Sequence, residues 1–134
     1  MSQESMEILK AVFDALAQGE AAALVQQTDP EIRIYPRPAE PGVREVYEGW
    51  EGLEEYVVNW YSAWDEYEVE PVRFVDAGDQ VVVVLREQGR MAQSGIEVVE
   101  EFSHSFKLRD DRIIEWRMYD SYAEALEGVG LAAG

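Results

Sequence analysis

The sequence has no cysteine and only one histidine, His104, among its 134 residues. Without cysteine, neither a disulfide nor a thiolate nucleophile can form. A single histidine does not favour a zinc site either, because zinc sites typically use several histidine or cysteine ligands. We therefore expect no metal and no cofactor.

Long apolar runs are missing as well. The longest, Val81–Leu85, is far too short to span a bilayer. The first four residues, 1–4, are polar or acidic after the initial methionine, which is wrong for a signal peptide. We expect a soluble protein of the cytoplasm that has no membrane partner.

Basic residues are scarce, since 28 acidic side chains stand against 11 basic ones and give a formal net charge of −17. Such a field repels phosphate backbones and anionic lipid surfaces. The charge therefore predicts no nucleic-acid partner, and its simplest consequence is solubility.

Apolar residues, in contrast, are sufficient for a core, at 47% of the chain. A chain of this length buries roughly two-thirds of its unfolded surface when it folds. We expect one domain that covers residues 1–134.

The densest strand pattern lies in residues 80–119, which are rich in β-branched and aromatic side chains. The pattern predicts three consecutive antiparallel strands: Val81–Gly89, Ile96–Leu108 and Arg112–Tyr119. In the last of them, alternation favours Ile114, Trp116 and Met118 as the residues that face the core.

Helical and shorter strand patterns surround this meander. Periodic apolar residues and caps predict helices at Ser5–Gln18, Glu20–Gln27, Glu51–Trp64 and Tyr122–Glu127. Further strands are expected at Glu31–Pro36 and Tyr67–Asp76, with a loop at Arg37–Glu45. Segregated helices and a meander indicate an α+β fold. We expect a cone-shaped roll, in which N-terminal helices cover the concave face of a curved, mostly antiparallel sheet.

Aromatic residues are concentrated in the third predicted helix, where Tyr56, Trp60 and Trp64 lie close together. One interpretation is that these rings fill the space between helix and sheet. The other is that they line a ligand pocket together with Tyr35 and Trp116.

Three polar residues are candidates for chemistry. His104 shares a strand face with Phe102 and Phe106, and is either a satisfied core histidine or a pocket hydrogen-bonding group or base. Arg86 follows an apolar run and needs a partner.

Carboxylates on neighbouring strands, among them Glu101 and Asp120, could supply that partner to Arg86. The resulting cluster is either a structural or dimer-interface ion pair, or a polar cluster at the cavity floor. Asp120 itself is either a residue before the last helix or, in a dry pocket, an acid or base.

The ordered set of these segments resembles the SnoaL-like family, within the superfamily named after nuclear transport factor two. The residues that carry the resemblance are Tyr47-Glu48-Gly49, Gly52, Asp76–Asp79, Gly89-Arg90, Ser94-Gly95, Phe102–Arg109, Arg112-Ile113, Tyr119-Asp120, Glu124–Leu126 and Gly130-Leu131. The resemblance implies a cone-shaped α+β fold, a hydrophobic pocket and a homodimer formed through the sheet. It implies no specific activity.

No catalytic set known from the superfamily is present intact. The early tyrosine of ketosteroid isomerase is missing, since the first helix has Phe13, and one of the two histidines of scytalone dehydratase is absent. Arg86 and Asp120 match only part of the Asp–Arg–Asp relay of limonene-epoxide hydrolase. The usual Asp-Gly turn is replaced by Asp110-Asp111, where a turn is still expected.

Three hypotheses about function follow. The first is a cofactor-independent cyclase, isomerase or hydrolase that acts on a small apolar or aromatic ligand. Asp120 or His104 would then move a proton, and Arg86 would stabilise negative charge. The second is a non-catalytic binding or dimerisation module. The third is an architectural protein whose cone is filled by its own side chains.

Overall fold

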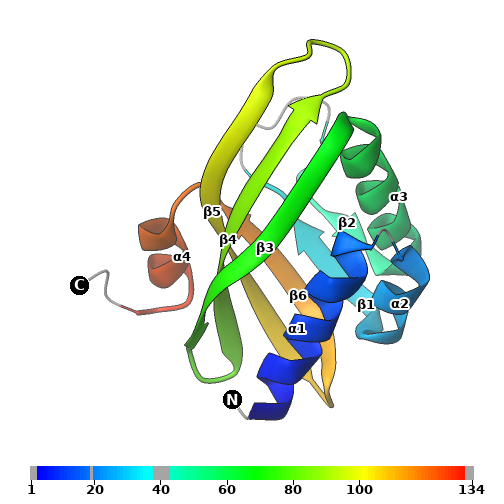
Figure 1. The fold of residues 1–134 in the computed structure, drawn as a ribbon. Coiled ribbons are helices and arrows are strands. Elements are labelled where there is room, and N and C mark those ends of the chain that lie inside the picture. Colours follow the sequence, from blue (N-terminus) through cyan, green and yellow to red (C-terminus); the bar gives the residue numbers. More distant parts are fainter. Residues whose placement is uncertain (1–2, 19, 38–42, 132–134) are drawn as a thin grey trace.

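The computed structural model describes residues 3–18, 20–37 and 43–131 of the chain (Figure 1). Its elements follow in the order α1 (Gln3–Ala17), α2 (Ala21–Gln26), β1 (Thr28–Tyr35), β2 (Tyr47–Glu48), α3 (Gly49–Ser62), β3 (Trp64–Asp76), β4 (Gln80–Met91), β5 (Glu97–Arg109), β6 (Arg112–Tyr119) and α4 (Tyr122–Gly128). The α+β class predicted from the sequence is confirmed. Residues 38–42 of the expected loop lie outside the described residues.

One sheet holds the six strands of the described residues, in the order β2-β1-β6-β5-β4-β3. Strands β3 to β6 form the predicted antiparallel meander. The pairing of β1 with β6 is parallel, and it joins β1 and β2 to the meander. Because β1 and β6 are far apart in the sequence, no local sequence pattern predicts this pairing.

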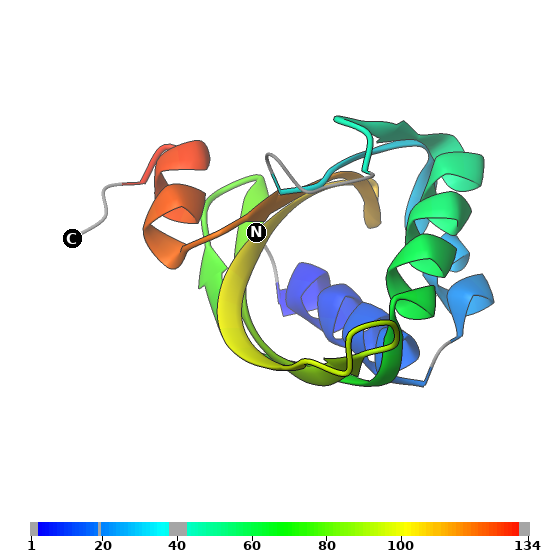
Figure 2. The ribbon, with the colours of Figure 1, turned by 90° about the horizontal axis from the view of Figure 1, so that it is seen from above.

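The sheet curls strongly, and α1 lies inside the curve (Figure 2). Helix α3 flanks the open side, while α4 lies outside, against the convex face. Helix α1 contributes Leu9, Val12 and Phe13 to the core because these residues recur on one helical face. They pack against the concave face of the sheet, where Leu85 and Phe106 are fully buried.

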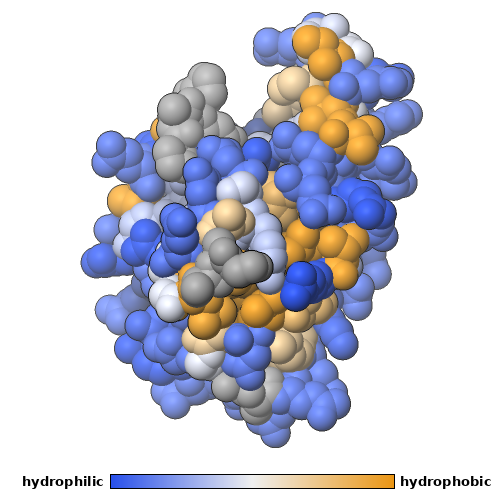
Figure 3. Space-filling view, turned by 90° about the vertical axis from the view of Figure 1, so that its left-hand side faces the viewer, coloured by the Kyte–Doolittle hydropathy of each residue, from blue (hydrophilic) through white to orange (hydrophobic). Residues whose placement is uncertain are grey.

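Helix α4 begins as the sequence predicts. The Ser121 side chain accepts a hydrogen bond from the backbone N–H of Glu124 at 3.1 Å, which satisfies one free donor of the first turn. The side of the molecule that carries α4 is hydrophilic around its rim, with apolar patches in its middle and at the tip of the β4–β5 hairpin (Figure 3). Ile96 and Val99 are 58% and 73% exposed there. A homodimer through the sheet remains a prediction.

Two local expectations are wrong. Helix α3 ends at Ser62, and Trp64 begins β3 instead of continuing the helix. In β6 the buried residue is Ile113, not Ile114. Lys107 pairs with Glu115 and Leu108 with Ile113, so Ile114 has no partner in β5 and is the extra residue of a β-bulge. The bulge shifts the alternation of β6 by one residue, so that Ile113 faces the core.

The Asp110-Asp111 turn is present. Both residues have positive φ, 52° and 62°, which is the geometry of a type I′ hairpin turn. None of the helices in the described part of the chain is both long and apolar enough to cross a membrane.

Candidate functional site

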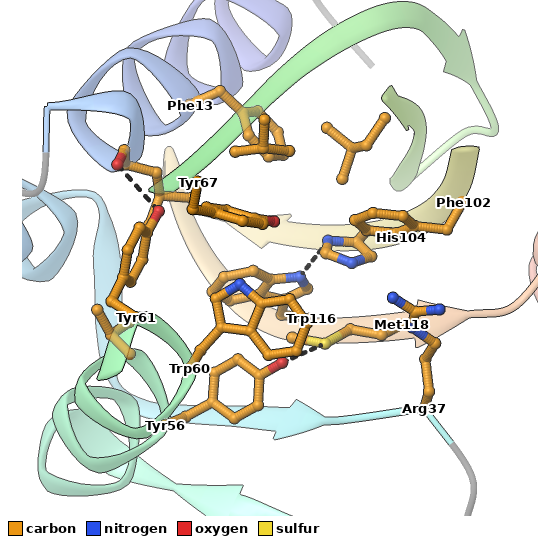
Figure 4. A pocket seen from close by; sticks show the side chains of 14 residues that line it. Phe13, Arg37, Tyr56, Trp60, Tyr61, Tyr67, Phe102, His104, Trp116 and Met118 are labelled. Atoms are coloured by element: carbon orange, nitrogen blue, oxygen red, sulfur yellow. Dashed lines mark hydrogen bonds between the residues drawn. The ribbon is translucent and has the colours of Figure 1, made fainter. Parts of the chain in front are cut away.

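The interior of the roll contains a small cavity of about 40 Å³. Its lining is aromatic and comes from α1, α3 and four strands, with Phe13, Tyr56, Trp60, Tyr67 and Trp116 among its residues (Figure 4). Roughly 10–15 Å³ of this kind of volume holds one water molecule, so the cavity admits a small group but no ring. The aromatic side chains therefore fill most of the cone.

A larger, open cleft of about 860 Å³ lies at the mouth of this cavity. The cavity and the cleft share Arg37, Tyr56 and Trp60 in their linings, so the two spaces adjoin. The cleft also contacts Trp64, Glu87 and Glu100. Its volume is within the range of small-molecule sites, and its lining combines aromatic rings with a few charged groups.

Strand alternation places Glu87 at this cleft. Val83, Leu85 and Glu87 share the concave face of β4, and the Glu87 side chain is only 1% exposed. Across the sheet, Glu87 pairs with Glu100 of β5, and from β3 the Tyr67 hydroxyl donates a 2.7 Å hydrogen bond to Glu87 Oε2. A carboxyl group is thus held among aromatic rings with one fixed donor.

Arg37, just after β1, connects the acidic groups at the cleft. Its Nη2 lies 2.8 Å from Glu100 Oε1 and 3.6 Å from Glu87 Oε1. Its Nη1 lies 3.8 Å from Asp120 Oδ1, and its guanidinium carbon lies 4.6 Å from the centre of the Phe102 ring. The guanidinium is therefore fixed on one side by carboxylates and on the other by an aromatic face.

The pKa of Glu87 is raised to about 7, mainly by burial and also by the hydrogen bond with Glu100. The Tyr67 hydroxyl and the charge of Arg37 oppose this rise. The pKa of Glu100 moves the other way, because the bonds from Glu87 and Arg37 favour its charged form. The pair therefore holds one proton near neutral pH, mainly on Glu87.

His104 lines the inner cavity and is neutral. Burial lowers its pKa to about 3, with a smaller contribution from the charge of Arg37. Its Nδ1 accepts a 2.9 Å hydrogen bond from the indole N–H of Trp116. The sequence left open a core histidine or a pocket group, and the structure places His104 at the cavity as a residue with a partner.

Four of the predicted site residues gather at the cavity: His104, Tyr56, Trp60 and Trp116. Trp64 lies at the adjoining cleft. Tyr35 lies elsewhere, in a shallow depression on the outer surface, with the guanidinium of Arg117 3.9 Å from its ring centre.

Arg86 and Glu101 do not belong to the site. They oppose each other on β4 and β5, and both are exposed, because they are one residue out of phase with Glu87 and Glu100. Arg86 Nη1 lies 3.6 Å from Glu70 Oε1, on the outer face of β3. The expected cluster of Arg86, Glu101 and Asp120 at the cavity floor is therefore wrong.

Asp120 lies at the edge of the charged group rather than in a dry pocket. Its side chain is 60% exposed, and its contact with the site is the 3.8 Å approach to Arg37. It immediately precedes the cap of α4, as the structural interpretation of the sequence expected.

Arg37, Glu87, Glu100 and Tyr67 were missed as site residues. Alternation from Val83 and Leu85 would have placed Glu87 on the concave face, in preference to Arg86. Arg37 gives no such signal, because its position depends on the non-local pairing of β1 with β6. Within the described ranges, no group of three or more His, Cys, Asp or Glu side chains is arranged to hold a metal ion.

Solved structures share this architecture. A nuclear transport factor two-like protein of unknown function from Burkholderia pseudomallei superposes with a TM-score of 0.80 at 16% identity, covering 97% of this chain and 99% of that one. The protein TerC, co-crystallised with polyporic acid, gives a TM-score of 0.79 at 17% identity, with 95% and 98% covered. A putative SnoaL-like polyketide cyclase from a Jannaschia species gives 0.77 at 20% identity, with 100% and 97% covered.

At these identities the similarity shows the fold alone. A comparison with curated protein sequences finds no match. The model of the SnoaL-like domain, however, matches residues 9–116, which include the whole of β3, β4 and β5 and most of the cleft. The chain therefore belongs to the SnoaL-like domain family.

Proposed function

We propose that the cleft binds a small, mainly apolar, ring-containing molecule and that Glu87 exchanges a proton with it. The observation that carries the proposal is the buried Glu87 carboxyl at the base of the cleft, 1% exposed and hydrogen-bonded to Tyr67. A carboxyl group with a pKa near 7 can both give and take a proton at neutral pH.

The neighbouring groups support this role. Arg37 is positioned to stabilise negative charge that develops on a ligand, and Glu100 accepts or returns the proton that Glu87 shares with it. Cyclisation, isomerisation and hydrolysis all need proton transfer and can proceed without a cofactor. The names of the similar structures, a polyketide cyclase and a protein crystallised with polyporic acid, agree with a ring-containing ligand.

The proposal is tested with wild-type protein, Glu87→Gln and the matched control Glu101→Gln. Thermal shifts would be read with aromatic and alicyclic ketones, phenols and epoxides, and hits assayed for turnover by mass spectrometry. We expect Glu87→Gln to keep binding and lose turnover by at least about 100-fold, since general acid–base groups contribute about that much. Glu101→Gln should behave as wild type. Equal turnover in all three proteins contradicts the role of Glu87.

A second candidate function is a binding protein without catalysis. It is favoured by the small size of the inner cavity, about 40 Å³, which cannot surround a ring and shield it from water. In that case the same compounds shift the melting temperature, none is converted, and Glu87→Gln changes affinity alone.

A further inference from the structure

His104 and Trp116 form a buried pair at the inner end of the site. His104 comes from β5 and Trp116 from β6, and their side chains share the concave face of the sheet. The indole Nε1 lies 2.9 Å from His104 Nδ1. His104 is also the only histidine of the protein, so every imidazole signal in solution belongs to it.

The chemistry of this bond fixes where the imidazole proton is. An indole N–H donates hydrogen bonds and cannot accept them, so Nδ1 must present its lone pair to Trp116. The proton of the neutral ring is therefore on Nε2. The low pKa of His104 agrees, because it keeps a second proton off the ring at neutral pH.

The Nε2 side of the ring faces the inner cavity, toward Met118 and Arg37 (Figure 4). Neither of these neighbours offers a ready acceptor, since the Met118 sulfur already accepts from the Tyr56 hydroxyl at 3.1 Å and arginine has no acceptor. An Nε2–H that faces this largely apolar cavity can donate to an acceptor that enters it. The cavity of about 40 Å³ has room for one oxygen substituent but not for the ring that bears it.

We propose that Trp116 is a positioning residue that fixes His104 as an Nε2–H donor, and that this N–H binds an oxygen acceptor at the inner end of the ligand. The second part of this proposal, the binding of a ligand oxygen by His104, rests on the proposed function. The ring would then lie in the outer cleft, while its carbonyl or ether oxygen enters the cavity. His104 binds and orients, and Glu87 is left as the group that transfers the proton.

The first test is long-range ¹H–¹⁵N NMR on the single histidine, without ligand. We expect one Nε2–H tautomer that does not titrate between about pH 5 and 8. In Trp116→Phe, Nδ1 loses its donor and both tautomers should be populated. Trp60→Phe is the matched control, because Trp60 lines the same cavity and packs on the Tyr67 ring, whereas the hydrogen bond to His104 comes from Trp116.

An Nδ1–H tautomer or a charged ring in the wild type overturns the proposal, even if Trp116→Phe fails to fold. A single Nε2–H tautomer that persists in a folded Trp116→Phe overturns the positioning role of Trp116.

The second test uses 1-tetralone and tetralin, two ring systems that differ in one carbonyl oxygen. We expect the ketone to bind more tightly and to shift the Nε2 resonance. In His104→Phe the preference for the ketone should fall about fivefold, as for one neutral hydrogen bond. An unchanged preference overturns the acceptor site while leaving the cleft as a binding site. If neither compound binds, both the proposed function and the acceptor site at His104 are contradicted. The tautomer of His104 is still decided by the NMR test.

Discussion

Glu87 and Glu100 are directly opposite each other on β4 and β5, yet the Glu87 side chain is 1% exposed and that of Glu100 is 39% exposed. Two carboxylates this close cannot both be charged without a cost, so burial decides which one keeps the proton. Arg37 lies nearer to Glu100, at 2.8 Å, and holds the negative charge there. The asymmetry of the pair follows from its position at the boundary between the dry interior and the cleft.

The stability of the protein should therefore depend on pH through Glu87. Its folded-state pKa of about 7 is higher than the ordinary 4.5, so the folded state holds a proton that the unfolded state releases, and stability falls as pH rises between these values. In Glu87→Gln this loss is absent, because the amide imitates the protonated acid and can donate to Glu100. We expect the variant to gain on the order of 2 kcal/mol over wild type between pH 5 and 8 in urea unfolding.

Glu101→Gln, on the exposed face of the neighbouring strand, is the control and should follow the wild-type profile. The lowered pKa of Glu100 has the opposite effect on stability, because the stability that it adds is lost as the pH falls. Glu100 is present in both proteins, so the comparison of wild type with Glu87→Gln reports on Glu87. Parallel stability profiles for wild type and Glu87→Gln would contradict the raised pKa.

Tyr67 should control the proton affinity of Glu87. Its hydroxyl donates to Glu87 Oε2 at 2.7 Å and favours the charged carboxylate, so Tyr67→Phe should raise the pKa of Glu87 above 7. The measurement is the ¹³C shift of the Glu87 carboxyl against pH. Tyr61→Phe is a matched control, because it also removes one hydroxyl bond, to the Leu16 carbonyl, but does not touch Glu87. A Glu87 pKa that is the same in both variants would exclude a role for the Tyr67 bond.

How much of this site the sequence predicts depends on whether local patterns determine it. The meander, the Ser121 cap and the core face of α1 were predicted because alternation, capping and helical periodicity are local. The same alternation would have found Glu87, since it is in phase with Val83 and Leu85. The bulge at Ile114 is not visible in the sequence, because strand pairing and not composition creates it.

Other parts of the site depend on contacts between distant segments. Arg37 reaches Glu100 only because β1 joins β6 in parallel, over a separation of 63 residues in the chain. The end of α3 at Ser62 was missed because Trp64 continues the helical spacing of Trp60. Trp64 instead pairs with Met91 in the sheet, and this pairing outweighs the helical pattern.

Gly89 should be intolerant of a side chain, although it lies in a strand. A Cβ there would come within 2.5 Å of the Glu66 carbonyl oxygen and 2.7 Å of the Trp64 ring, so strand and ring would have to move apart. We expect Gly89→Ala to cost about 1 to 3 kcal/mol in urea unfolding and to change Trp fluorescence at the cleft. Gly95→Ala is the comparison, since its Cβ meets nothing within 4 Å and only its positive φ of 71° is strained. If Gly89→Ala unfolds at the same urea concentration as the wild type, close packing is not what requires Gly89.

The Asp110-Asp111 turn offers a stabilising change. Both residues adopt the left-handed conformation, which glycine reaches without a steric penalty. Asp111→Gly should therefore raise stability by about 0.5 to 1 kcal/mol, measured by thermal and urea unfolding. Ala77→Gly, in the β3–β4 turn without positive φ, adds the same freedom to the unfolded chain and should lower stability. A loss in both variants would show that the turn carries no strain.

Arg37 and Arg86 provide the most direct comparison between the site found in the structure and the one expected from the sequence. Arg86 is 56% exposed and pairs with an exposed Glu70, so Arg86→Ala should cost less than about 0.5 kcal/mol and leave ligand binding unchanged. Arg37→Ala removes the cation beside Glu87 and Glu100, which should raise both carboxyl pKa values and cost about 1.5 to 3 kcal/mol at pH 8. The missing charge matters only where the carboxylates are ionised, and Glu100, with its lowered pKa, is the last of the pair to be protonated. The cost of Arg37→Ala should therefore shrink only when the pH falls far enough to protonate Glu100 as well as Glu87. A cost that is independent of pH would mean that Arg37 acts through its packing on Phe102 instead.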